Sequence, residues 1–112
     1  MVFDEGLAER TEGYFRTREE PIDTVAKKMI GGICYMVNGN MCVGILDDSL
    51  MSRVGKDGYE SALAEPGTRQ AIGNFKAMKG IVWIDPEAIA DDARFGDWIE
   101  RALAFVRTLP TK

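Results

Sequence analysis

The segment Asn38-Gly39-Asn40 separates two apolar runs and constrains the fold more than any other feature of the chain. The runs cover residues 33–37 and 41–46. Asn-Gly readily supplies the positive φ angles that a tight hairpin turn needs. We therefore predict a β-hairpin, followed after a short polar connection by a third antiparallel strand over residues 50–54.

Side-chain alternation along the hairpin predicts which residues share a face of the sheet. With a two-residue turn, we expect one face to carry Cys34, Met36, Met41, Val43 and Ile45, and the other to carry Ile33, Tyr35, Val37, Cys42 and Leu46. Both faces are apolar, so we expect helices on one face and a second subunit on the other. Cys34 and Cys42 would then lie on opposite faces, which disfavours a disulfide, although a three-residue turn would reopen the question.

The length of 112 residues predicts one domain, 1–112, that can bury a core of its own. The N-terminus is acidic and no apolar run is long enough to cross a membrane, so we expect a cytoplasmic protein. The chain has no histidine, which excludes Ser-His and Cys-His catalytic pairs and imidazole metal ligands. The net charge of −4 argues against a general nucleic-acid binder.

Along the sequence, helices are predicted before, between and after the strands. We expect a helix over residues 4–18, a strand that begins near residue 23, and a short helix over 56–64. Residues 68–74 predict a loop or weak strand leading to a strand at 75–78, and residues 81–84 a further strand.

Two candidate helix starts, Asp85-Pro86 and Asp91-Asp92, precede the last helix. Its apolar stripe consists of Phe95, Trp98, Ile99, Ala102, Leu103, Val106 and Leu109. The order is α-β-β-β-α-β-β-α, an α+β fold with a mainly antiparallel sheet packed by helices.

Several motifs have both a structural and a chemical interpretation. We interpret Gly31-Gly32 as a bend in a long strand or a close approach of another backbone, because no phosphate-loop spacing accompanies it. The acidic pairs Asp47-Asp48 and Asp91-Asp92 fit turns and helix caps better than a cation site. The basic residues Lys27, Lys28, Arg53, Lys76 and Lys79 could gather at one sheet edge, although edge-protecting charges are the commoner explanation.

Several short segments occur together along nearly the whole chain. They are KKMIGG from Lys27, VNGNMCVG from Val37, RVG from Arg53, YESAL from Tyr59, PG at Pro66, MKG from Met78 and DDARFGDWIERALAF near the end. In this combination the chain resembles the N-terminal domain of the TfoX/Sxy family. Ile30 stands where the family usually has phenylalanine, and Lys56 where it commonly has proline.

The resemblance implies an α+β domain similar to secretion-chaperone folds, and no catalytic residues. It also implies a link to bacterial competence regulation with the cyclic-AMP receptor protein. The family's regulators carry a helical C-terminal domain, whereas this chain ends at Lys112. We therefore expect a stand-alone single-domain member.

We expect a non-enzymatic protein-interaction module, accessory to transcription or competence regulation, with no cofactor and no metal. Its expected partners are a second copy, bound through a sheet face, and a protein of the transcription machinery. Its expected interaction or ligand surface comprises Lys28, Gly31, Gly32, Tyr35, Arg53 and Lys79.

The alternative is a small-molecule-binding protein or minor enzyme that uses a cleft near Gly31-Gly32, Arg53 and Lys79, with Cys34 or Cys42 as a thiol. Strand cysteines among apolar residues are more often inert than reactive. Direct contact of the basic residues with DNA is a weaker third hypothesis, and we expect no membrane contact.

Overall fold

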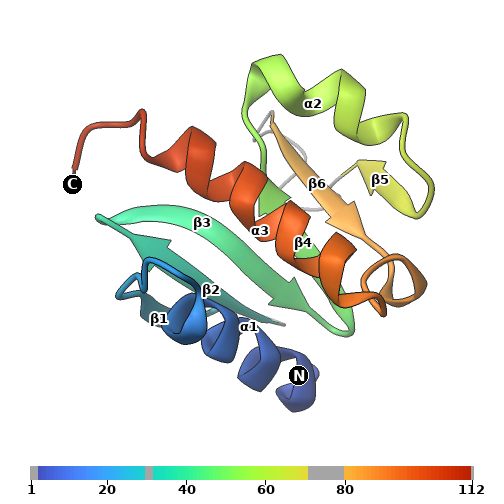
Figure 1. Ribbon diagram of the computed structural model, residues 1–112. Coiled ribbons are helices and arrows are strands. Elements are labelled where there is room, and N and C mark those ends of the chain that lie inside the picture. Colours follow the sequence, from blue (N-terminus) through green and yellow to red (C-terminus); the bar gives the residue numbers. More distant parts are fainter. Residues whose placement is uncertain (1–2, 30–31, 71–79, 112) are drawn as a thin grey trace.

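The described residues form a six-stranded antiparallel sheet with helices over one face, which confirms the expected α+β class (Figure 1). The computed structural model describes residues 3–29, 32–70 and 80–111. The strand order across the sheet is β1-β2-β3-β4-β6-β5. The elements in chain order are α1 (Glu5–Thr17), β1 (Val25–Met29), β2 (Gly32–Val37), β3 (Asn40–Leu46), β4 (Ser49–Arg53), α2 (Lys56–Leu63), β5 (Thr68–Gln70), β6 (Ile81–Ile84), the 3-10 turn η2 (Pro86–Ala88) and α3 (Asp92–Val106).

The two long helices begin at aspartate caps, because a carboxylate can accept a hydrogen bond from an amide that has no partner within the helix. Asp4 accepts from the Leu7 amide at 3.0 Å, and Asp91 accepts from the Arg94 amide at 2.9 Å. The apolar stripe predicted for α3 faces the sheet, and its members from Phe95 to Val106 are buried. Both helix predictions are confirmed.

The predicted hairpin is confirmed, with a two-residue turn at Asn38-Gly39. Asn38 has φ 53° and Gly39 φ 81°, and Val37 pairs with Asn40 across the turn. Further along, Met36 pairs with Met41 but Tyr35 pairs with Val43. β3 therefore contains one extra residue, which is a β-bulge.

The bulge makes part of the predicted face assignment wrong. An extra residue reverses side-chain alternation beyond it. Val43 and Ile45 therefore join the helix-side core that also contains Tyr35, while Leu46 moves to the opposite side. Cys34 and Cys42 lie in different clusters, on opposite faces as predicted, and no disulfide joins them.

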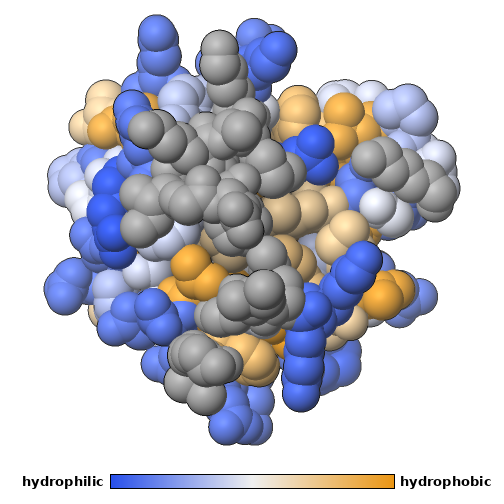
Figure 2. Space-filling view, turned by 180° about the vertical axis from the view of Figure 1, so that it is seen from behind, coloured by the Kyte–Doolittle hydropathy of each residue, from blue (hydrophilic) through white to orange (hydrophobic). Residues whose placement is uncertain are grey.

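A smaller apolar cluster lies on the face of the sheet away from the helices, so both faces are apolar, as expected. This rear cluster consists of Cys34, Met41, Met51, Ile81 and Trp83, all of them buried. Seen from that side, hydrophobic side chains surface in patches among hydrophilic ones (Figure 2).

Two further expectations need correction. Met29 pairs with Gly32, so the chain reverses between β1 and β2 instead of bending within one long strand. A side chain at Gly32 would overlap the carbonyl oxygen of Ile45, which is the close backbone approach considered above. Asp85-Pro86 starts a helical turn, as predicted, but only the single 3-10 turn η2, and the Asp85 side chain makes no capping hydrogen bond. Its carboxylate accepts from Nε of Arg69 at 2.8 Å instead.

The other predicted elements agree with the structure where it describes them. β4, α2 and β6 lie within about a residue of their predicted positions, and β5 covers the start of the segment predicted as a loop or weak strand. The strand predicted at residues 75–78 lies outside the described residues. In the described part of the chain, no helix is long and apolar enough to span a membrane.

Candidate interaction site at the edge of the sheet

β1 forms one edge of the sheet, and in the described structure it has a neighbouring strand on one side only. Its residues from Val25 to Lys28 are all exposed. Val25 is 69% exposed, and no other large apolar side chain among the described residues is exposed to this degree. An edge of this kind presents backbone donors and acceptors that another strand can use.

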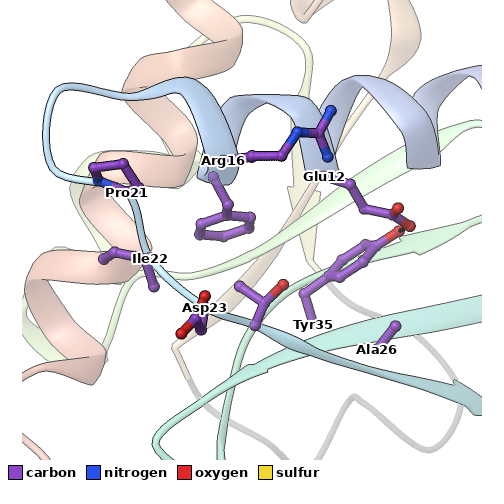
Figure 3. Close-up of a pocket in the computed structure, with 9 residues that line it drawn as sticks. Glu12, Arg16, Pro21, Ile22, Asp23, Ala26 and Tyr35 are labelled. Atoms are coloured by element: carbon purple, nitrogen blue, oxygen red, sulfur yellow. Dashed lines mark hydrogen bonds between the residues drawn. The ribbon is translucent and has the colours of Figure 1, made fainter.

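A cavity of about 310 Å³ lies beside this edge, between the C-terminal half of α1 and β1 (Figure 3). The chain turns back after α1, and the Ile22 amide donates to the Phe15 carbonyl at 3.0 Å. Ala26 pairs with Tyr35 on β2, and both line the cavity. Since Ala26 carries only a methyl group, the helix and the edge strand leave this hollow between them.

The polar lining of the cavity contains two carboxylates, from Glu12 and Asp23, and one guanidinium, from Arg16. The Tyr35 hydroxyl donates to the Glu12 carboxylate at 2.7 Å. Burial, and then Glu12, raise the pKa of Tyr35, so the phenol stays protonated near neutral pH. The cavity therefore combines an excess of negative charge with aromatic walls, an environment that suits a cationic side chain.

The helix beside the cavity is held in place by a polar cluster that joins α1 to α3. Arg18 donates to both carboxylate oxygens of Glu100, through Nε at 2.9 Å and Nη2 at 2.7 Å. The Tyr14 hydroxyl donates to the same carboxylate at 2.6 Å. Bidentate contact with a guanidinium is geometrically specific, so this cluster fixes the end of α1 over the sheet.

The structure brings two of the predicted surface residues to this site and separates others. Tyr35 lines the cavity, and Lys28 lies exposed on β1. Gly32 is level with Ser49 on β4, since both pair with Leu46, whereas Arg53 lies four residues further along that strand, roughly 13 Å away. Gly32 and Arg53 therefore do not share a cleft.

Gly31 and Lys79, also predicted for that cleft, lie outside the described residues. The predicted gathering of basic residues at one edge does not occur for those that are described. Lys27 and Lys28 lie on β1, and Arg53 lies on β4, three strand spacings or roughly 14 Å across the sheet. Lys76 also lies outside the described residues.

Comparison with protein families gives a match to the TfoX N-terminal domain over residues 14–106. The match begins inside α1 and ends with the last residue of α3. The chain belongs to the TfoX N-terminal domain family. No curated protein and no solved structure matches it significantly. The expected likeness to secretion-chaperone folds therefore stays a prediction.

Sequence analysis of this TfoX N-terminal domain missed Glu12, Asp23 and Ala26, which the structure brings together at the cavity. These residues come from a helix, a connection and a strand, so no sequence spacing relates them. A small residue inside an edge strand was the available signal. It becomes informative only once the register places Ala26 opposite Tyr35.

A second cavity in this TfoX domain, of about 380 Å³, lies at the start of α2. It is lined by Arg53, Lys56 and Phe105, together with Val54 and Asp57. The Arg53 guanidinium donates to the Met41 carbonyl at 3.3 Å and lies 5.5 Å from the centre of the Phe105 ring. This arrangement holds Arg53 at the mouth of a basic hollow.

The thiols of the domain do not lie at either cavity. Cys42 is fully buried, and burial raises its pKa to about 12. Burial also raises the pKa of Cys34. A thiol reacts as its thiolate, so both cysteines are poor nucleophiles near neutral pH. Among the described residues, no group of acidic and cysteine side chains could hold a metal ion.

Proposed function

We propose that this TfoX N-terminal domain is a non-enzymatic protein-interaction module, accessory to transcription or competence regulation. The exposed edge of β1 beside an acidic, aromatic cavity carries the proposal. A partner strand could use the backbone groups of β1, while one of its side chains enters the hollow over Ala26. Family membership supports the proposal of a regulatory role.

The buried thiols support the non-enzymatic part of the proposal. Sequence analysis named Cys34 and Cys42 as the candidate nucleophiles, and burial raises the pKa of both. The Tyr35 hydroxyl donates a hydrogen bond to Glu12 and the pKa of the phenol is raised, so Tyr35 keeps its proton near neutral pH, which opposes its use as a base. The side chains that the cavity offers are therefore better suited to holding a partner than to bond chemistry.

The second cavity favours the alternative function, a small-molecule-binding protein. Arg53 and Lys56 give this hollow an excess of positive charge over Asp57, so its ligand would be a small anion. Calorimetric titration with inorganic phosphate and with a dicarboxylate, repeated on Arg53→Gln, tests this alternative. Binding that the substitution abolishes supports it, and the absence of binding contradicts it.

Capture experiments with matched variants test the leading proposal. Val25→Asp places a charge on the exposed edge of β1, and Ala104→Asp places one on the exposed side of α3. Proteins captured from the source cells should be lost with Val25→Asp and kept with Ala104→Asp. If the two variants capture the same proteins as the original chain, the edge is not the interaction surface.

The regulatory part of the proposal has its own measurement. Transcript profiles of cells that lack the gene should change, and the original chain and Ala104→Asp should restore them. Val25→Asp should fail to restore them although it folds. Unchanged transcripts on loss of the gene would contradict a role in transcription and leave the interaction part to be judged by capture.

A further inference from the structure

We propose that the partner of the β1 edge is a second copy of this chain, paired antiparallel so that Lys27 of each copy lies opposite Lys27 of the other. This pairing places Lys28 of each copy beside the acidic cavity of its neighbour. The inference rests on the proposed interaction function and names its partner.

The register follows from the length of β1. A two-fold axis at Lys27 is the one antiparallel arrangement that uses all five residues of the strand, Val25–Met29. It places Lys28 of the second copy opposite Ala26. It also brings a neighbouring strand alongside Val25, the exposed apolar side chain that the single chain leaves in water.

Side-chain direction then brings the charges together. Ala26 and Lys28 are two positions apart on one strand, so their side chains share a face of the sheet. Ala26 lines the cavity, and residues opposite one another in an antiparallel pair also project to the same face. Lys28 of the second copy therefore extends over the cavity that contains Glu12 and Asp23, and its ammonium can pair with these carboxylates.

Repulsion between like charges and the small size of the interface limit the strength of the dimer. The two Lys27 side chains lie directly opposite each other, and such like-charge pairs are destabilising. Arg16 also lines the cavity and reduces its negative charge. One pair of five-residue strands is a small interface, so we expect a weak dimer whose population depends on concentration.

The sheet edge suits a second copy better than the sheet faces do. The helices cover one face (Figure 1). The rear cluster occupies the other, and each of its five members is at most 8% exposed. The cluster therefore has little apolar surface left to bury against another subunit. Val25 on the edge retains such surface.

Disulfide trapping tests the register directly. Lys27→Cys would place two thiols on directly opposed residues about 4.5 to 5.5 Å apart between Cα atoms, within the range that a disulfide spans. Both cysteine variants are made in a Cys34→Ala chain, because Cys34 pairs with Lys27 between β2 and β1 and its thiol would compete for Lys27→Cys within one copy. Ala104→Cys, on the exposed side of α3, is the matched control. Mild oxidation should convert most of Lys27→Cys to a covalent dimer and little of Ala104→Cys. Equal cross-linking of the two variants, or none in either, overturns the proposal.

A charge exchange tests the role of Lys28. Lys28→Glu and Asp23→Lys should each raise the dimer dissociation constant at least fivefold, measured by sedimentation equilibrium, because each places like charges at the cavity. The double variant should recover most of the affinity. Circular dichroism checks that each variant folds. Single variants that dimerise as the original chain does overturn the proposal.

These outcomes separate this inference from the proposed function. A chain that stays monomeric at millimolar concentration, and whose Lys27→Cys variant does not cross-link, excludes the second copy. Loss of other captured proteins with Val25→Asp would still support an interaction module in that case. If Lys27→Cys does not cross-link and Val25→Asp captures the same proteins as the original chain, the edge of β1 is not an interaction surface.

Discussion

Gly80 packs directly against Gly55, and this contact joins two of the short motifs that carry the family resemblance. The Gly80 carbonyl accepts hydrogen bonds from the amides of Val54, at 2.8 Å, and of Gly55, at 3.1 Å. Both glycines have positive φ, 94° for Gly80 and 86° for Gly55. The chain before β6 and the chain after β4 thus meet backbone to backbone, which requires residues without a Cβ.

We predict that Gly80→Ala destabilises the fold by about 2 to 4 kcal/mol. A Cβ at this position would stand 2.8 Å from the Gly55 carbonyl carbon, and positive φ adds strain. Gly58→Ala in α2 is the control, because its Cβ would meet nothing closer than 3.6 Å and alanine favours helix. Urea denaturation measures both. A Gly80→Ala chain as stable as the original would contradict the close packing.

Trp98 is the largest fully buried side chain of the core. Its backbone carbonyl accepts a hydrogen bond from the buried Ser52 hydroxyl at 2.8 Å, which ties α3 to β4. We predict that Trp98→Ala costs about 3 to 5 kcal/mol, because the core cannot collapse fully around the cavity. Ala104→Ser on the exposed side of the same helix should change the free energy of unfolding by less than about 0.5 kcal/mol.

Both cysteines should resist iodoacetamide at pH 7.5 in the folded protein and react fully in denaturant. The reason is that both thiols are buried and have raised pKa values. Mass spectrometry counts the adducts. Rapid labelling of either cysteine in the folded chain would make that thiol a candidate nucleophile again.

Alkaline pH should weaken the fold through Cys42. Its folded pKa of about 12 lies above the ordinary value of 9.0. A raised folded pKa gives a contribution that is fully present below the unfolded pKa and is lost as pH rises through the folded value. The free energy of unfolding should therefore fall between pH 9 and 12, and fall less in Cys42→Ala. Equal slopes for the two chains would contradict the assignment to Cys42.

Local sequence signals were sufficient to predict the elements with strong local chemistry. Asn38-Gly39 predicted its turn because few other dipeptides adopt two positive φ angles without strain. Asp4 and Asp91 predicted helix starts because their carboxylates satisfy amides only three residues away. In each case the interaction that decides the structure lies within a few residues of the signal.

The features that the sequence did not reveal depend on contacts between distant segments. The bulge in β3 carries no glycine or proline signal, yet it determines that Val43 faces the helices. The same limit applies to the cavity, since Glu12, Asp23 and Ala26 meet only after α1 packs and β1 pairs with β2. Burial over the whole core sets the register of the strands and the placement of the helices. A pattern within a single segment gives no information about that burial.

The polar cluster of Tyr14, Arg18 and Glu100 should stabilise the fold less at both acidic and alkaline pH. Hydrogen bonds from Arg18 lower the pKa of Glu100, so its contribution is present above its ordinary pKa near 4.5 and is lost as pH falls through the folded value. Burial raises the pKa of Tyr14 to about 12, so its contribution is full below pH 10 and is lost as pH rises toward 12.

Glu100→Gln should cost about 1 kcal/mol at pH 7, a small value because the carboxylate is partly exposed and screened by water. The difference in unfolding free energy between the original chain and Glu100→Gln should shrink as pH falls below 4.5 and through the lowered folded pKa of Glu100, because both chains then carry a neutral group. Glu60→Gln, at an exposed position of α2, is the control and should change the free energy of unfolding by less than about 0.5 kcal/mol. A Glu100→Gln deficit that stays constant down to pH 2.5 would mean that shape, not charge, holds α1 against α3, so the cavity beside β1 would depend on packing alone.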